Sequence, residues 1–119
     1  MDETNKQRII QELVPGKQIT LAHIIANPDE ILYKKLGLDP AVEYSKSAIG
    51  ILTVSPAETA IIAGDIAIKS SGAQLGFVDR FSGTVILTGT YSEVDASLRA
   101  VVTYAEDVLG FTVCRITKT

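Results

Sequence analysis

The sequence predicts an α/β (α+β) fold in which an antiparallel sheet carries its helices on one face. Two long stretches with helical periodicity, 56–69 and 92–109, are interleaved with four short runs of strand-forming residues. Two of these runs are separated by Ser82-Gly83, a turn typical of a hairpin. The resulting order over residues 48–117 is β-α-β-β-α-β, the ferredoxin-like arrangement. Such a sheet is expected to bury one face under both helices.

The first third of the chain adds a strand and a short helix to this core. Residues 17–26 are rich in isoleucine and predict a strand. Asn27-Pro28 predicts a helix start and Gly37 its end, because these residue types favour those positions. Residues 38–46 have no clear period and predict a loop. The chain is therefore expected to be one domain, 1–119, with an N-terminal strand at 1–14, an added strand and helix at 17–37, and the core at 48–117.

Within the core, local signals predict where each element begins. The strand at 48–54 is followed by Ser-Pro-Ala-Glu at 55–58, which predicts a capping box at the start of the first long helix. Gly64 lies inside that helix at a cost of up to about 1 kcal/mol, which predicts a close backbone approach there. Ser92 is expected to cap the second long helix, and residues 111–117 to form the last strand.

Composition excludes several classes of protein. Eleven Lys and Arg against fourteen Asp and Glu give a net charge of −3, which argues against a nucleic-acid partner, since such proteins present a basic face. No apolar run approaches the roughly 20 residues of a membrane span, and the start lacks the pattern of a signal peptide. We therefore expect no membrane partner and a cytoplasmic location. The mean hydropathy of +0.25 suggests apolar surface that is used in assembly.

The residues that could carry chemistry do not form a constellation. His23 is the only histidine and Cys114 the only cysteine, so neither has the neighbours of a metal site, and both are interpreted as structural. Glu58 and Asp65 lie two helical turns apart and could pair for acid–base catalysis, although a solvated helix face is the favoured interpretation. No metal, no cofactor and no enzyme activity are expected.

Two segments have no clear place in the predicted core. The first is a hairpin turn with a phenylalanine at its tip, which either folds back or faces another subunit or a pore: Asp79, Arg80, Phe81, Ser82 and Gly83. The second is a short apolar strand near the chain start: Ile9, Ile10, Gln11, Glu12, Leu13 and Val14. Because a short strand is not stable alone, it must pair with the sheet or with copies of itself.

Several runs occur together in an order that points to one family. They are AIGI at 48–51, DIAIK at 65–69, LGF at 75–77 before the turn at 79–83, and VIL at 85–87. The run HIIANP that starts at His23 precedes them. The combination resembles the shell proteins of bacterial microcompartments. Ordinary members of that family carry a similar run at the C-terminus, so the chain resembles the circularly permuted members. The ethanolamine-utilization EutS type is the nearest resemblance, followed by the propanediol-utilization type.

The resemblance implies a structural protein rather than a catalyst. It implies a homohexamer that tiles, with other shell proteins of the same compartment, into a shell around encapsulated enzymes in the cytoplasm. The enclosed pathway degrades a small substrate through a volatile aldehyde. The turn at 79–83 would surround the sixfold axis, and the N-terminal strands, residues 5–14, would form a six-stranded barrel that caps the pore. A closed barrel leaves no strand edge exposed.

Three further positions follow from the same resemblance. Lys69 matches a lysine at the hexamer edge, whereas Asn27 stands where ordinary members have an arginine that pairs with such a lysine. Ser47 stands where relatives with bent rings have glycine, which reaches positive φ at little cost. A flat ring with one backbone conformation at 45–50 is therefore expected. A ferredoxin-like module that binds a regulatory ligand is the alternative function.

Overall fold

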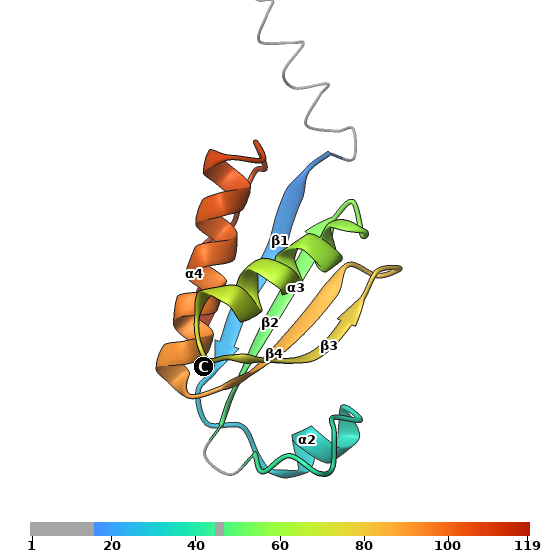
Figure 1. Cartoon of the computed structure of the whole chain (residues 1–119), viewed down its shortest axis with the longest axis vertical. Coiled ribbons are helices and arrows are strands. Elements are labelled where there is room, and N and C mark those ends of the chain that lie inside the picture. Colours follow the sequence, from blue (N-terminus) through green and yellow to red (C-terminus); the bar gives the residue numbers. More distant parts are fainter. Residues whose placement is uncertain (1–15, 45–46) are drawn as a thin grey trace, which may run out of the picture.

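The computed structural model describes residues 16–44 and 47–119. They form a five-stranded sheet in the order β3-β4-β2-β1-β5, with α3 and α4 on one face and α2 beyond one end of the sheet (Figure 1). The predicted fold class is confirmed. The elements are β1 (Gln18–Ile25), α2 (Ile31–Lys35), β2 (Ala48–Ser55), α3 (Thr59–Ser70), β3 (Gln74–Asp79), β4 (Thr84–Gly89), α4 (Tyr91–Asp107) and β5 (Thr117–Lys118). No helix in the described ranges is long and apolar enough to span a membrane.

The main core lies between the sheet and the two long helices. Alternate residues of the central strands and one stripe of α4 fill it, as the period of each element requires. Gly50 lets α4 approach β2 closely, because a Cβ built there would lie 2.6 Å from Val94 Cγ1. Fully buried side chains at the centre of this core are Ile24, Leu52, Val85, Leu87, Val94 and Leu98.

The strand β1 lies inside the sheet and not at its edge. It pairs antiparallel with β2 along its length, with Ile24 opposite Gly50, and parallel with β5 on its other side. A ferredoxin-like core by itself would place its last strand beside its first. Here β1 takes that position, and it buries Ala22 and Ile24 completely beneath the helices. The added strand is therefore an integral part of the core.

The last strand is shorter than predicted. Residues 111–117 were expected to form it, but the structure has an isolated bridge from Thr112 to Gln18 and then only β5. The register of β1 shifts between Ile19 and Leu21. An irregularity of this kind bends and twists its strand, and it lies on the stretch of β1 between its two contacts with the last segment. The side chains between the two contacts still pack against the core.

Both predicted caps of the long helices are wrong, for local reasons. Ser55 still belongs to β2 and pairs with Gln18, so α3 begins later, after Glu58, without a side-chain cap. The cap of α4 is Thr90 and not Ser92. The Thr90 hydroxyl accepts the Glu93 N–H at 3.1 Å while the Glu93 carboxylate accepts the Thr90 N–H at 2.9 Å, a complete capping box.

Two smaller expectations also change. The helix α2 begins after Glu30 rather than at Asn27, and the Asp29 carboxylate accepts the Ile31 N–H at 3.0 Å. Its end at Gly37, with φ of +73°, is as predicted. A Cβ built on Gly64 would meet the Leu75 side chain at 3.6 Å, an ordinary contact, so the predicted close backbone approach is wrong.

The register places two groups of residues at opposite ends of the sheet. Asp79 pairs with Thr84 at the hairpin end of β3 and β4. At the other end Ala48 pairs with Gly89, and Ile25 with Ile49. Asn27 and α2 follow that end of β1, so they lie far from the hairpin tip (Figure 1).

Candidate assembly surfaces

The hairpin tip at residues 79–83 is held by its own aspartate. One Asp79 carboxylate oxygen accepts the Phe81 N–H and the other accepts the Ser82 hydroxyl, both at 2.8 Å. The hydrogen bond from the Phe81 N–H has the largest effect on the pKa of Asp79 and lowers it below its usual value. The hydrogen bond from the Ser82 hydroxyl lowers it further. The carboxylate therefore stays ionised at neutral pH, and the tip has a defined shape.

The hairpin tip packs closely against the end of β2 at Gly83. The φ of this glycine is +77°, and a Cβ built on it would lie 2.2 Å from the Val54 carbonyl oxygen. The Val54 N–H donates to the Gly83 carbonyl at 2.8 Å. Only glycine suits this position, since any side chain would meet both an unfavourable φ and a backbone atom.

Phe81 points away from the core. Its side chain is 80% exposed, so the interpretation in which it folds back is wrong. The Arg80 guanidinium carbon lies 4.8 Å from the centre of the Phe81 ring, within the range of a cation–π contact. The tip therefore presents an aromatic ring and a cation outward, residue types that are enriched in the centres of protein interfaces.

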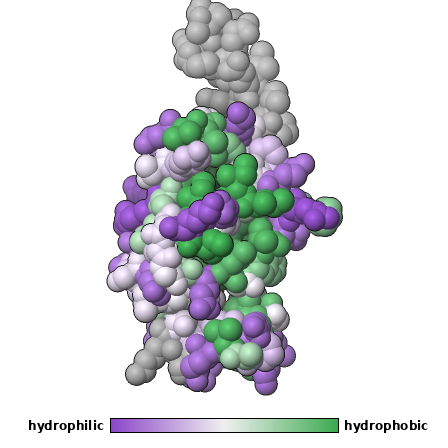
Figure 2. All heavy atoms as spheres, in the orientation of Figure 1, coloured by the Kyte–Doolittle hydropathy of each residue, from purple (hydrophilic) through white to green (hydrophobic). Residues whose placement is uncertain are grey.

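An apolar surface runs along α3 and the edge strand β3. Leu75 and Val78 pair with the core residues Leu87 and Val85, so both point to the helix side of the sheet. Figure 2 shows hydrophobic surface over these two elements. We call this surface the α3–β3 flank and define it by four side chains that are each at least 39% exposed: Ile61, Ile68, Leu75 and Val78. Contiguous apolar surface of this kind marks a contact site.

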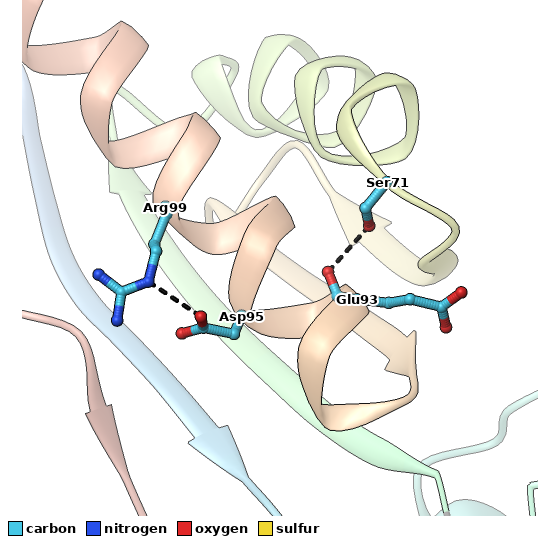
Figure 3. Close-up of polar contacts among 4 residues, drawn as sticks. All are labelled: Ser71, Glu93, Asp95 and Arg99. Atoms are coloured by element: carbon cyan, nitrogen blue, oxygen red, sulfur yellow. Dashed lines mark hydrogen bonds and ion pairs between the residues drawn. The ribbon is translucent and has the colours of Figure 1, made fainter.

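Lys69 lies near the end of α3 that is far from the hairpin tip. Its ammonium forms an ion pair with Asp65 one turn earlier, at 2.8 Å, and both side chains are largely exposed. The end of α3 is fixed to α4, because the Ser71 hydroxyl donates to the Glu93 carbonyl at 2.8 Å (Figure 3). Asp65 is thus paired with Lys69 on an exposed surface, which agrees with the interpretation of this helix face as solvated.

A groove of about 520 Å³ lies between α2 and residues 37–44. The rings of Tyr33 and Tyr44 stack there, with centroids 4.9 Å apart and planes 7° from parallel. The Tyr33 hydroxyl donates to the Ser47 carbonyl at 2.6 Å. Burial raises the pKa of Tyr33, and the nearby carboxylate of Glu30 raises it further. Burial also raises the pKa of Tyr44, and the charge of Asp39 adds to this effect. Carboxylates therefore lie close to the aromatic pair.

His23 and Cys114 have the surroundings of structural residues. The two ring nitrogens of His23 lie 2.6 Å from the Thr117 hydroxyl and 3.0 Å from the Thr119 hydroxyl, which ties the last residues to β1. Cys114 is half-buried against the core. Across residues 16–44 and 47–119, no three potential metal-ligating side chains gather.

Sequence reasoning singled out the hairpin tip and missed two of these surfaces. Tyr33 and Tyr44 are eleven residues apart on either side of Gly37, and only the fold brings their rings together. The α3–β3 flank likewise joins two elements. The predicted barrel strand lies outside the described residues: Ile9, Ile10, Gln11, Glu12, Leu13 and Val14. Of the segment 45–50, residues 45 and 46 also lie outside them.

Comparison with known proteins identifies the family. The BMC domain matches residues 48–117. The chain is 55% identical over 112 residues to the shell protein PduU of Salmonella typhimurium, covering 94% of this chain and 93% of that protein. It is 51% identical over 114 residues to the shell protein EutS of the same organism, with coverage of 96% and 98%. The solved CutR flat hexamer aligns with a TM-score of 0.81 at 47% identity, over 94% of this chain and 99% of that chain. The chain therefore belongs to the BMC-domain family and is a structural shell protein of bacterial microcompartments.

Proposed function

We propose that this chain forms homohexameric rings that tile into the shell of an ethanolamine-utilization microcompartment in the cytoplasm. The observation that carries the proposal is the similarity over almost the full length of EutS, together with the flat hexamer of a chain that is 47% identical. In this function the shell restricts the passage of aldehyde and other metabolites. PduU is 55% identical and EutS 51%, so a propanediol-utilization compartment is the second candidate.

The placement of the surfaces supports a particular ring. We propose that the hairpin tip faces the sixfold axis, that the α3–β3 flank contacts the next protomer, and that Asn27 and Lys69 lie at the outer edge. The tip and the edge residues lie at opposite ends of the protomer. This arrangement is required if one end of each protomer faces the axis of the ring and the other end forms its perimeter. The exposed apolar flank lies between these ends and would be covered in the assembly.

The remaining features of the proposal rest on the resemblance. The chain is proposed to be circularly permuted, with 17–37 as the permuted strand and helix and 48–117 as the core. Residues 9–14 would supply one strand each to a barrel on the axis. Ser47 would keep the ring flat. Other shell proteins would tile with these rings, and encapsulated enzymes would lie within the shell.

A ligand-binding regulatory module is the alternative function, and one observation favours it. The groove beside Tyr33 and Tyr44 falls in the size range of small-molecule sites, about 300–1,000 Å³. A regulatory module would form dimers or tetramers whose mass depends on a ligand, whereas a shell protein forms rings without one.

The compartment type can be tested by incorporation into shells. We expect the tagged full chain to enter purified compartments of a host grown on ethanolamine several times more efficiently than those of a host grown on 1,2-propanediol. The measurement is the tagged chain per unit of shell protein, by quantitative mass spectrometry. Preferential entry into the propanediol compartments would reverse the assignment, and absence from both would refute both compartment types.

A further inference from the structure

The groove between α2 and residues 37–44 lies at the end of the protomer that the proposed function assigns to the ring edge. We propose that this groove is a ring-to-ring contact site that receives lysine side chains from a second copy of this chain in the adjacent ring. This inference rests on the proposed ring arrangement and goes beyond it, because it assigns a partner to a surface that the ring itself leaves open.

The chemistry of the groove suits a lysine side chain. Glu30 and Asp39 supply negative charge beside the stacked rings of Tyr33 and Tyr44. Buried Leu38 adds an apolar wall. A lysine presents an ammonium that is attracted by carboxylates and aromatic faces, and a methylene stem that packs on apolar surface. Acidic, aromatic and apolar components of the groove thus all match the same side chain.

The polar atoms of the groove favour a side chain over a small ligand of defined shape. The Tyr33 hydroxyl is already used by the Ser47 carbonyl, and one Asp39 oxygen accepts the Ala41 N–H at 2.9 Å. These groups are committed to holding the loop. Three acidic residues and one lysine, Lys34, line the groove, so it offers net negative charge that a flexible lysine can approach from several directions.

The same end of the protomer also carries the cations that such a contact needs. Lys34 and Lys35 lie in the last turn of α2, where Lys34 also lines the groove, and Lys69 lies near the end of α3 with its side chain 72% exposed. Two identical edges that meet across a twofold axis must each carry both members of every pair. The acidic groove and the basic end of α2 lie at the same end of the protomer, so each edge carries both members of the pair. Each exposed pair is weak alone, but every ring edge repeats it.

A charge-swap experiment tests the proposal on the full chain. One variant, Glu30→Lys with Asp39→Asn, removes the acidic component. A second, Lys35→Glu with Lys69→Glu, removes basic groups that lie outside the groove. We expect each variant to keep the hexamer mass in light scattering but to form at least fivefold fewer flat arrays by electron microscopy. A chain that carries all four changes should recover arrays to within twofold of wild type, because acidic and basic groups then meet again at every edge.

The control is Glu106→Lys with Asp107→Asn, the same change in charge at the far end of α4, which should leave arrays unchanged. Either two-site variant tiling as well as wild type, or a four-site variant that keeps the hexamer mass but fails to recover arrays, would overturn the groove proposal while leaving the ring intact. Wild-type rings that never associate at their edges would overturn it too. Absence of rings in the wild type would instead refute the proposed function.

Discussion

Replacing Ile68 and Leu75 by glutamate is expected to convert the ring into monomers. Both side chains belong to the α3–β3 flank and are 42% and 39% exposed in the protomer, so the variant is paired with a check that the fold survives. In the ring, each contact would bury two carboxylates without partners, at a cost of several kcal/mol for each charge. It would also lose the apolar burial, at about 25 cal/mol per Å².

The measurement is the mass in solution by light scattering. Wild type should give six chains of 12.7 kDa, about 76 kDa, and the double variant a single chain of about 12.7 kDa with an unchanged circular dichroism spectrum. Ile31→Glu is the control, since Ile31 is 52% exposed but lies on α2, away from the flank. A double variant that stays hexameric would show that the flank is not the protomer contact.

Gly83→Ala is expected to lower the free energy of unfolding by about 3 kcal/mol. A non-glycine residue in the left-handed region costs about 1–2 kcal/mol. The added Cβ must also move the Val54 carbonyl oxygen, which would lie only 2.2 Å away, or shift the hairpin. Urea unfolding of a non-assembling background, such as the double flank variant, gives the stability of the protomer itself.

Gly110→Ala separates the two causes. Gly110 has nearly the same φ, +74°, but a Cβ built on it would have no neighbour within 4 Å. The Gly110→Ala change should therefore lower the free energy of unfolding only by the cost of the left-handed backbone conformation, about 1 kcal/mol. If the two variants were equally destabilised, the Val54 carbonyl oxygen would add nothing to the cost of a side chain at position 83.

The parts of the fold that sequence predicted are those with strong local patterns. The stripe of α4 and the apolar runs of β2 and β4 gave correct elements, and the turn at Ser82-Gly83 gave the hairpin. Cap positions failed because neighbouring candidates compete: Ser55 was retained by β2, and Thr90 made a better capping box than Ser92. The position of β1 beside β2 depends on long-range pairing, which local patterns do not encode.

The candidate surfaces also divide into those that the sequence could indicate and those that depend on the fold. The unusual composition of the tip, with Arg80 and Phe81 exposed, could be noticed in the sequence alone. The α3–β3 flank and the stacked tyrosines could not, since Ile68 and Leu75, or Tyr33 and Tyr44, come from different elements. The predictions for residues 9–14 and for the flat ring remain predictions.

Cryo-electron microscopy of the purified full chain tests the central claim most directly. We predict flat, sixfold-symmetric rings with the 79–83 hairpins around the axis, α2 at the perimeter, additional density from residues 5–14 on the axis, and one backbone conformation at 45–50. Particles with twofold symmetry, or rings with the hairpin tips at the perimeter and α2 at the centre, would contradict the account.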